Sequence, residues 1–184
     1  MNDIELIGTF SLGNKVMVSD PCYSLNTWCQ GVLENVKSGI WKAYLKMSDE
    51  GTWGIRVAEL IAINDEYCKE HPVIVDEHSV IINERQAFEV GVDSGCAGIF
   101  DYDYYAKYHT DDEKDTEWYE TIICDQFFPT HDSFEWENSI FTDSEGVASN
   151  SGYGDGGYEC YVARNDDGEI VGIKIVYISE EDDD

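Results

Sequence analysis

The sequence predicts a mainly β protein: one compact domain of antiparallel strands with one or two short helices and a C-terminal β-hairpin, with an α+β arrangement as the alternative. Three observations support this. Short runs of β-branched and aromatic residues recur between turn signals. The length, 184 residues, is that of one ordinary domain. Hydrophobic residues make up 42% of the chain and aromatic residues 13%, which is enough to bury a core despite the acidic charge.

The expected strands are bounded by Gly, Pro, Asn and Asp, which favour turns. In order, they cover residues 4–10, 15–19, 39–47, 53–63, 73–82, 88–92, 147–149, 158–164 and 169–178. Helices are expected over 102–108 and 116–128. The second of these segments places apolar residues at helical spacing. The globular domain should span residues 1–179, followed by an acidic tail at 180–184.

The last hairpin has a register that can be predicted. Residues 165–168, Asn-Asp-Asp-Gly, form a strong turn signal, so Arg164 should pair with Glu169. The same residues lack the alternating carboxylates of a calcium loop, so the turn is the better interpretation. The remaining expected pairs are Tyr158 with Ile175, Glu159 with Lys174, Cys160 with Ile173, Tyr161 with Gly172 and Val162 with Val171.

The charge balance excludes two classes of partner. The chain has 11 Lys and Arg against 39 Asp and Glu, a formal charge of -28. Without a basic face, direct nucleic-acid binding and docking on anionic membranes are excluded. The acidic N-terminus and the lack of a long apolar run predict a cytoplasmic protein, in the host cytoplasm if it is encoded by a phage. The six cysteines are scattered without a CxxC pair, which predicts reduced thiols and no metal site.

The first segment with unusual composition is Ser19-Asp20-Pro21-Cys22-Tyr23. Pro21 cannot donate to a β-ladder, so the chain must leave the sheet and present Asp20, Cys22 and Tyr23 at a strand end. A cysteine nucleophile would need a nearby His or cation, and none is close in the sequence. A packed thiol beside a turn-capping Asp is therefore the better interpretation of Cys22.

The second segment covers residues 92–101. Its small residues and two glycines allow close approach of a ligand or of another strand, so a tight connection between strands is the alternative to a binding loop. Asp93 and Ser94 precede the glycine at position 95, and Asp101 ends the segment. The two carboxylates, Asp93 and Asp101, are candidates for paired acid/base work or for holding a hard metal.

The third segment covers residues 151–158 and has four glycines in six positions. No Lys, Arg or helix N-terminus follows, so it does not complete a phosphate site. It either holds Tyr153 and Asp155 at the mouth of a pocket or is a flexible entry to a strand.

These three segments are expected to converge, because strand ends on one edge of an antiparallel domain lie together. Asp20, Asp93 and Asp155 should surround one concavity, with Cys22 and Cys96 in or beneath its wall. The residues of this predicted ligand pocket are Asp20, Cys22, Tyr23, Asp93, Ser94, Asp101, Tyr153 and Asp155.

A second candidate site is the acidic and aromatic middle of the chain. Residues 101–137 hold twelve Asp and Glu against two lysines, interleaved with Tyr and Trp. The simpler interpretation is a solvated acidic face that keeps the protein soluble. The alternative is a surface for a basic partner, in which the carboxylates steer association and the aromatic rings anchor the partner. The residues of that predicted surface are Tyr102, Asp103, Tyr104, Tyr105, Asp111, Asp112 and Trp118.

The three segments also carry a family resemblance. The shared runs are Ser-Asp-Pro-Cys-Tyr at 19–23 continuing to Trp-Cys-Gln-Gly at 28–31, Val-Asp-Ser-Gly at 92–95 continuing to Asp101, and Ser-Gly-Tyr-Gly-Asp-Gly at 151–156. They resemble an uncharacterised group of small bacterial and phage proteins, a domain of unknown function. Cys96 stands where a Gln would be expected in that pattern. The resemblance supplies no mechanism, but a phage context implies roles against host defences.

Two functions follow as hypotheses. The first is an acidic binding protein, without catalysis, that engages a basic protein partner or blocks a host factor. The alternative is a small-ligand protein that sequesters or hydrolyses a nucleotide-like signalling molecule in the pocket of Asp20, Asp93 and Asp155. No cofactor is expected for the first, whereas the second would need either a divalent metal or a cationic portion of the ligand to offset the local negative charge.

Overall fold

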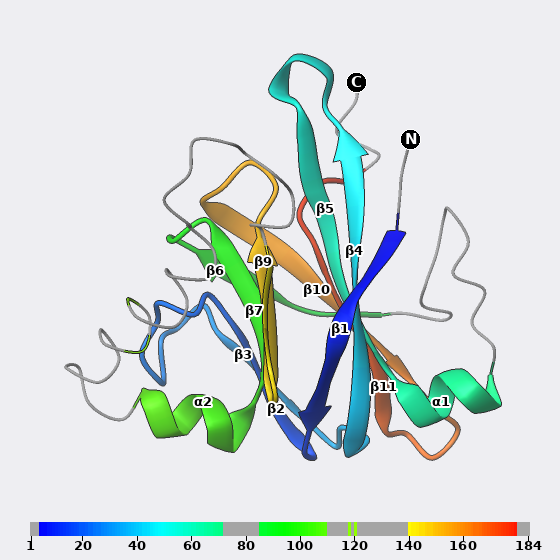
Figure 1. Cartoon of the computed structure of the whole chain (residues 1–184). Coiled ribbons are helices and arrows are strands. Elements are labelled where there is room, and N and C mark those ends of the chain that lie inside the picture. Colours follow the sequence, from blue (N-terminus) through cyan, green and yellow to red (C-terminus); the bar gives the residue numbers. More distant parts are fainter. Residues whose placement is uncertain (1–3, 72–84, 110–117, 119, 121–139, 180–184) are drawn as a thin grey trace.

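Two antiparallel sheets form the protein in the computed structural model, which describes residues 4–71, 85–109, 118, 120 and 140–179 (Figure 1). This confirms the predicted mainly β class. The six-stranded sheet has the order β1 (Ile4–Leu12), β4 (Gly39–Asp49), β5 (Ile55–Asn64), β11 (Ile170–Val176), β10 (Gly156–Arg164) and β6 (Arg85–Val92). The five-stranded sheet has the order β3 (Gly31–Glu34), β2 (Lys15–Ser19), β7 (Cys96–Asp101), β9 (Gly146–Asn150) and β8 (Ile140–Asp143).

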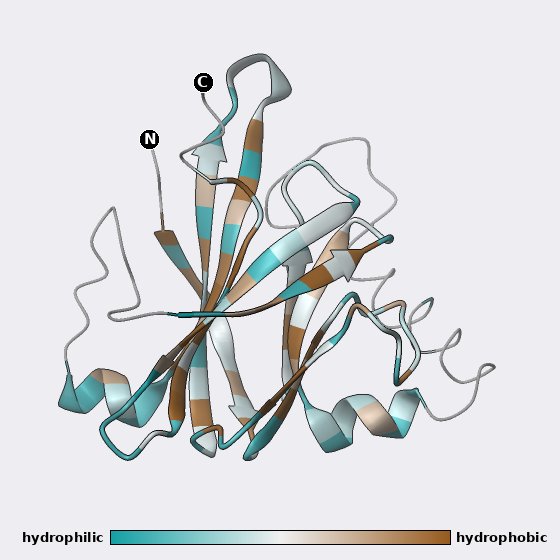
Figure 2. Cartoon of the chain, turned by 180° about the vertical axis from the view of Figure 1, so that it is seen from behind, coloured by the Kyte–Doolittle hydropathy of each residue, from teal (hydrophilic) through white to brown (hydrophobic). Residues whose placement is uncertain are grey.

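The main core lies between the two sheets, and the alternation of side chains along each strand decides which residues enter it. On β2, Val16 and Val18 belong to this core, whereas Met17 belongs to a second cluster on the opposite face. Trp41 of β4 is fully buried in the main core. Figure 2 shows the same alternation as hydrophobic and hydrophilic colours following one another along β4 and β5. Burying one face of each sheet supplies the main stabilisation of the fold.

Each sheet carries one short helix on its outer side. Helix α1 (Asp65–Glu70) packs against the six-stranded sheet, and α2 (Tyr102–Tyr108) packs against the five-stranded sheet. The Asn64 side chain caps α1, and the Asp101 side chain caps α2 by accepting hydrogen bonds from the backbone N–H groups of residues 103 and 104. The predicted helix at 102–108 is therefore present, whereas α1 was not predicted. No helix in the described ranges has the length and apolar character that crossing a membrane requires.

Strands β3, β7 and β8 were not expected from the sequence. For β7, the small residues that indicated a loop allow close packing: a β-carbon on Gly98 would overlap both the Phe100 ring and the backbone of Val147. The interpretation of residues 92–101 as one loop is therefore wrong from Cys96 onward. The expected strand at 73–82 lies outside the described residues, as does most of the expected helix at 116–128.

The predicted register of the C-terminal hairpin is wrong by two residues. Cys160 pairs with Ile175 instead of Ile173, because the turn is longer than expected and the register shifts next to Arg164. Asn165 accepts the Glu169 N–H through its side chain, so Arg164 pairs with Ile170 instead of Glu169. The other corrected pairs are Glu159 with Val176, Tyr161 with Lys174, Val162 with Ile173 and Ala163 with Gly172. A shift of two leaves every side chain on its predicted face.

Candidate functional site

The Asp20 carboxylate joins the first unusual segment to the second. Its Oδ1 accepts hydrogen bonds from the Cys22 N at 2.8 Å and the Ser94 Oγ at 2.7 Å. Its Oδ2 accepts hydrogen bonds from the Asp93 N at 2.8 Å and the Ser94 N at 2.7 Å. Asp20 is fully buried, so these donors replace the water that an exposed carboxylate would have. Asp20 therefore fixes the loops in place beneath the surface.

The two cysteines of the predicted pocket lie close to this carboxylate and are packed. Burial, followed by the negative charge of Asp20, raises the pKa of the Cys22 thiol well above its ordinary value. Cys96 is fully buried, with its Sγ 3.0 Å from the Ser94 Oγ. A thiol that stays protonated is a poor nucleophile, so the geometry supports a structural role for Cys22.

Helix α2 holds the first segment from the other side. The Tyr105 hydroxyl lies 2.5 Å from the Tyr23 carbonyl oxygen and 3.1 Å from that of Asp20. The buried ring of His109 stacks on Tyr105 with centroids 3.7 Å apart, and its Nε2 lies 3.1 Å from the Pro21 carbonyl oxygen. Residues 20–23 are thus fixed by Asp20 on one side and by α2 on the other.

This packing corrects the predicted partner surface. Tyr104, Tyr105 and Trp118 are buried, because they cover Phe100 on the outer face of the five-stranded sheet. These three rings therefore belong to the core and cannot anchor a partner. Tyr102 is half-buried and Asp103 is exposed; Asp111 and Asp112 lie outside the described residues.

The third segment meets the other two at one hollow of about 570 Å³. The Ser151 N donates a hydrogen bond to the Gly95 carbonyl oxygen at 3.0 Å, which joins the third segment to the second. We call this the acidic hollow and define it by Tyr23, Trp28, Glu89, Gly91, Asp93, Asp155, Gly156 and Gly157, which all line it. Each of the three segments contributes one of the predicted residues: Tyr23, Asp93 and Asp155.

The floor of the acidic hollow comes from the pairing of β6 with β10. Val90 and Val92 of β6 face the main core, so Glu89 and Gly91 face the opposite way. Gly91 pairs with Gly157, and Glu89 pairs with Glu159. A β-carbon on Gly157 would overlap the Glu89 carboxylate, which therefore lies across this glycine. The Cys29 side chain lies in the same way over Gly91, so the two paired glycines make room for a thiol and a carboxylate at the floor.

The acidic hollow has a negative electrostatic character. Glu89, Asp93 and Asp155 are exposed carboxylates, and none of the described residues that line the hollow is Lys, Arg or His. Burial, followed by a hydrogen bond with the Asp93 carboxylate, raises the pKa of the Tyr23 phenol, which stays neutral. The Trp28 side chain is 94% exposed at the rim. This combination attracts cations and repels phosphate groups.

Two predicted pocket residues lie elsewhere. Asp101 ends β7, about five strand residues or roughly 16 Å from its start near Asp93, so the two carboxylates do not form the expected pair. Asp101 instead caps α2 and accepts a hydrogen bond from the Gly13 N at 2.8 Å. Tyr153 lines a separate hollow of about 130 Å³ beside Ile55 and donates a hydrogen bond to Glu50. In the described ranges, no three His, Cys, Asp or Glu side chains are grouped as metal ligands.

Sequence reasoning did not assign Trp28, Glu89 or the paired glycines to the predicted pocket, although Trp28 belongs to the family pattern. The alternation in the expected strand 88–92 indicates that Glu89 points away from the core, but only the pairing with β10 brings it beside Gly157. Trp28 lies in the loop between β2 and β3, where no strand or helix periodicity indicates which way a side chain points. These residues can therefore be assigned to the hollow only from the tertiary structure.

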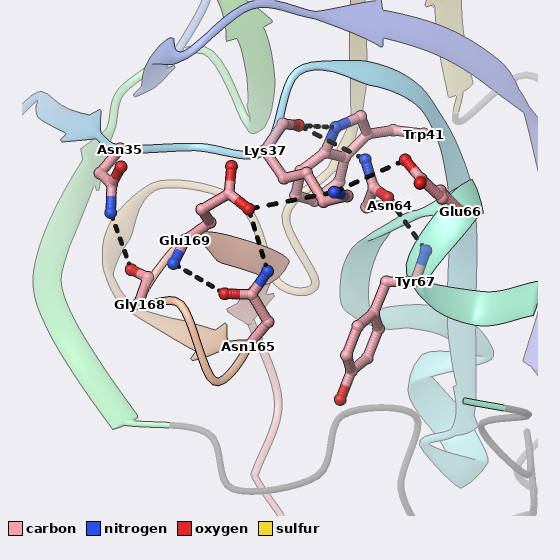
Figure 3. A network of polar contacts seen from close by, with 9 residues as sticks. All are labelled: Asn35, Lys37, Trp41, Asn64, Glu66, Tyr67, Asn165, Gly168 and Glu169. Carbon is pink, nitrogen blue, oxygen red and sulfur yellow. Dashed lines mark hydrogen bonds and ion pairs between the residues drawn. The ribbon is translucent and has the colours of Figure 1, made fainter. Parts of the chain in front are cut away.

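A second polar network, shown in Figure 3, closes the turn between β10 and β11. The Asn35 Nδ2 donates a hydrogen bond to the Gly168 carbonyl oxygen at 2.9 Å, and the Lys37 Nζ lies 3.5 Å from Glu66 and 3.9 Å from Glu169. Side chains of both charge signs line the adjacent hollow of about 580 Å³, including Lys37, Glu66, Arg164 and Asp166. This network holds the turn against α1, and its mixed charges distinguish it from the acidic hollow.

Comparison with known proteins identifies a family. The curated proteins contain no match to the chain, and neither do the solved structures. A family model described as "Protein of unknown function (DUF4241)" matches residues 12–175 and so covers all three segments that line or support the acidic hollow. The chain belongs to this family of proteins of unknown function, DUF4241.

Proposed function

We propose that the protein is a binding protein without catalytic activity, and that its acidic hollow engages a basic segment of a protein partner. The observation that carries the proposal is the composition of the hollow: Glu89, Asp93 and Asp155 surround it, Trp28 is exposed at its rim, and no described cationic side chain lines it. The formal charge of -28 would steer a basic partner over distance. Tryptophan is one of the residue types that are enriched among the residues that anchor protein interfaces.

The chemistry of the surrounding residues favours binding over catalysis. The Asp20 carboxylate is occupied by four hydrogen bonds from residues 22, 93 and 94. The raised pKa of Cys22 keeps its thiol protonated. Asp20 and Cys22 thus serve to hold the loops that form the hollow.

The alternative, a nucleotide-like ligand, has weaker support. Three carboxylates around the hollow would repel phosphate groups unless a divalent cation were bound between them. Incubation with nucleotides and magnesium or manganese, followed by chromatography, separates retention from hydrolysis. A retained or cleaved nucleotide would favour this alternative over a basic protein partner.

The setting of the proposed interaction is the cytoplasm. The resemblance to bacterial and phage proteins supports a partner in the host, and blocking a defence factor is the role that such a setting favours. To block such a factor, the protein would only need to cover its basic functional surface. The factor's own anionic ligand would then have to compete with the acidic hollow for that surface.

A capture experiment with matched variants tests the proposal. The hollow variant is Glu89→Gln, Asp93→Asn and Asp155→Asn; the control variant is Glu5→Gln, Glu34→Gln and Asp167→Asn, which changes the charge equally at exposed positions elsewhere. We expect the wild type and the control to capture the same basic protein from a bacterial lysate, with release between about 50 mM and about 500 mM salt. The hollow variant should lose it. Equal loss in both variants would show a general charge effect and contradict a site at the hollow.

A further inference from the structure

The residues of the acidic hollow also indicate whether an arginine or a lysine of the partner would bind there. This question rests on the proposed function. The floor is the first observation. Gly91 and Gly157 are paired across β6 and β10, and Gly156 follows beside Val92. The space over each paired glycine is filled by a neighbour: the Cys29 side chain lies over Gly91, and the Glu89 carboxylate lies over Gly157. The absence of a side chain at position 157 thus lets the Glu89 carboxylate lie close against the sheet within the hollow.

The carboxylates are the second observation. Glu89 and Glu159 are directly opposite each other, and like charges in that position destabilise a sheet. Glu159 accepts hydrogen bonds from the Gln86 Nε2, at 3.1 Å, and from the Tyr161 hydroxyl. The Glu89 carboxylate instead lies across Gly157, at the edge of the hollow. The pairing of Glu89 with Glu159 is thus electrostatically unfavourable, and it leaves the Glu89 carboxylate at the hollow, where it can attract a cation.

The aromatic rim is the third observation. Trp28 is 94% exposed and lies on the same loop as Tyr23, whose neutral phenol also lines the hollow. An exposed tryptophan face attracts a cation through its quadrupole, and a planar guanidinium can also stack on it. A lysine ammonium is compact and strongly hydrated, so it gains less from such a surface.

We propose that the group that enters the acidic hollow is an arginine guanidinium of the partner, stacked on Trp28 and hydrogen-bonded to Glu89. A guanidinium has five N–H donors in one plane and pairs with a carboxylate through two parallel hydrogen bonds. Such a group could stack on the Trp28 ring with its flat face while its edge pairs with the Glu89 carboxylate, since both residues line the hollow. The partner segment should therefore be rich in arginine and not only basic.

Three blocked peptides that share one glycine and serine scaffold test this proposal. One carries three arginines, one carries three lysines, and one carries three citrullines, which keep the planar shape without the charge. NMR titration of the full chain, read at the Trp28 indole, measures each affinity. We expect the arginine peptide to bind at least about fivefold more tightly than the lysine peptide, in line with a cation–π contribution of about 1 kcal/mol. The citrulline peptide should not bind.

Variants assign the preference to its residues. In Trp28→Leu, with binding read at other hollow resonances, the preference for arginine should fall to about twofold or less. The control is Trp53→Leu, because Trp53 is 69% exposed in the turn between β4 and β5 and does not line the hollow. That control should keep both affinities. Glu89→Gln should weaken the arginine and the lysine peptides together.

The outcomes separate this inference from the proposed function. Equal binding of arginine and lysine peptides, lost in Glu89→Gln, would overturn the guanidinium assignment and leave a basic partner in place. An arginine preference that survives Trp28→Leu would also overturn it. Binding of neither peptide, or binding unaffected by the three carboxylate substitutions, would overturn the proposed function as well.

Discussion

Ser94 donates two hydrogen bonds to the Asp20 carboxylate, one from its backbone N and one from its Oγ, each 2.7 Å long. The two residues are 74 positions apart in the chain. Their contact fixes the backbone of Asp93, which also donates to Asp20 and whose own side chain lines the acidic hollow. The shape of the hollow therefore depends on a carboxylate that is itself fully buried.

Replacing Asp20 with Asn should destabilise the fold. Each oxygen of Asp20 accepts two hydrogen bonds, and an Asn side chain has an NH2 group in place of one of these oxygens. The two donors that face the NH2 group would lose their acceptor in the protein interior. We expect the free energy of unfolding to fall by about 3 kcal/mol in urea denaturation. Asp167→Asn, at an exposed turn position, is the control and should change it by less than about 0.5 kcal/mol. Equal effects would show that the Asp20 contacts contribute little.

Removing the Tyr105 hydroxyl should loosen the first segment. Tyr105→Phe keeps the stacked ring but leaves the Tyr23 and Asp20 carbonyl oxygens without this donor. The expected cost is about 1–3 kcal/mol, with faster amide hydrogen exchange at residues 22–24. Tyr153→Phe, whose hydroxyl is at the exposed contact with Glu50, should cost less than about 0.5 kcal/mol. Unchanged exchange in Tyr105→Phe would contradict the proposed role of α2.

Glu89→Gln should stabilise the free protein while it weakens binding. The substitution removes the repulsion between Glu89 and Glu159, which is worth about 0.2–1 kcal/mol at low ionic strength. Thermal unfolding at low salt should show the gain, and high salt should remove it. Glu5→Gln, at an exposed position of β1 opposite Leu45, tests whether any loss of negative charge has the same effect. A gain in both variants would assign the effect to net charge instead of the cross-strand pair.

The protein should lose stability at alkaline pH. Burial raises the pKa of Cys160 from 9.0 to about 12. In the unfolded chain this thiol ionises near its ordinary value, so above about pH 9 the unfolded state binds fewer protons than the folded state. The contribution of Cys160 to the free energy of unfolding is therefore fully present below about pH 9. It is lost as the pH rises toward 12, and the free energy of unfolding falls by about 1.4 kcal/mol per pH unit because of this group.

Cys160→Ala provides the comparison for this prediction. The alanine variant should be less stable at neutral pH, because the substitution leaves a cavity in the main core. Its free energy of unfolding should fall less steeply between about pH 9 and about pH 11, so the two curves should approach each other. Tyr177 is also buried with a raised pKa and will cause part of the decline in both proteins. Parallel curves would contradict the assignment to Cys160.

The sequence by itself determined the class of the fold and most of its local structure. The alternation of Val16, Met17 and Val18 identifies a strand with two apolar faces, and the helix at 102–108 follows Asp101, a good capping residue. It also located three strand ends rich in Gly, Asp and Ser. These features depend on periodicity, turn chemistry and capping, which act over a few residues and can be read along the chain.

The tertiary structure decided which of these residues are exposed and which are neighbours. Tyr104 and Trp118 have the composition of an interface, yet they cover Phe100 in the core. Asp20 is buried as a structural carboxylate, whereas Glu89, which the strand alternation only directs away from the core, reaches the hollow through the pairing of β6 with β10. Even the hairpin register changed by two residues, because one longer turn and one irregularity altered the pairing. Burial and proximity are set by contacts between distant segments, and the free energy that selects those contacts belongs to the whole packed domain.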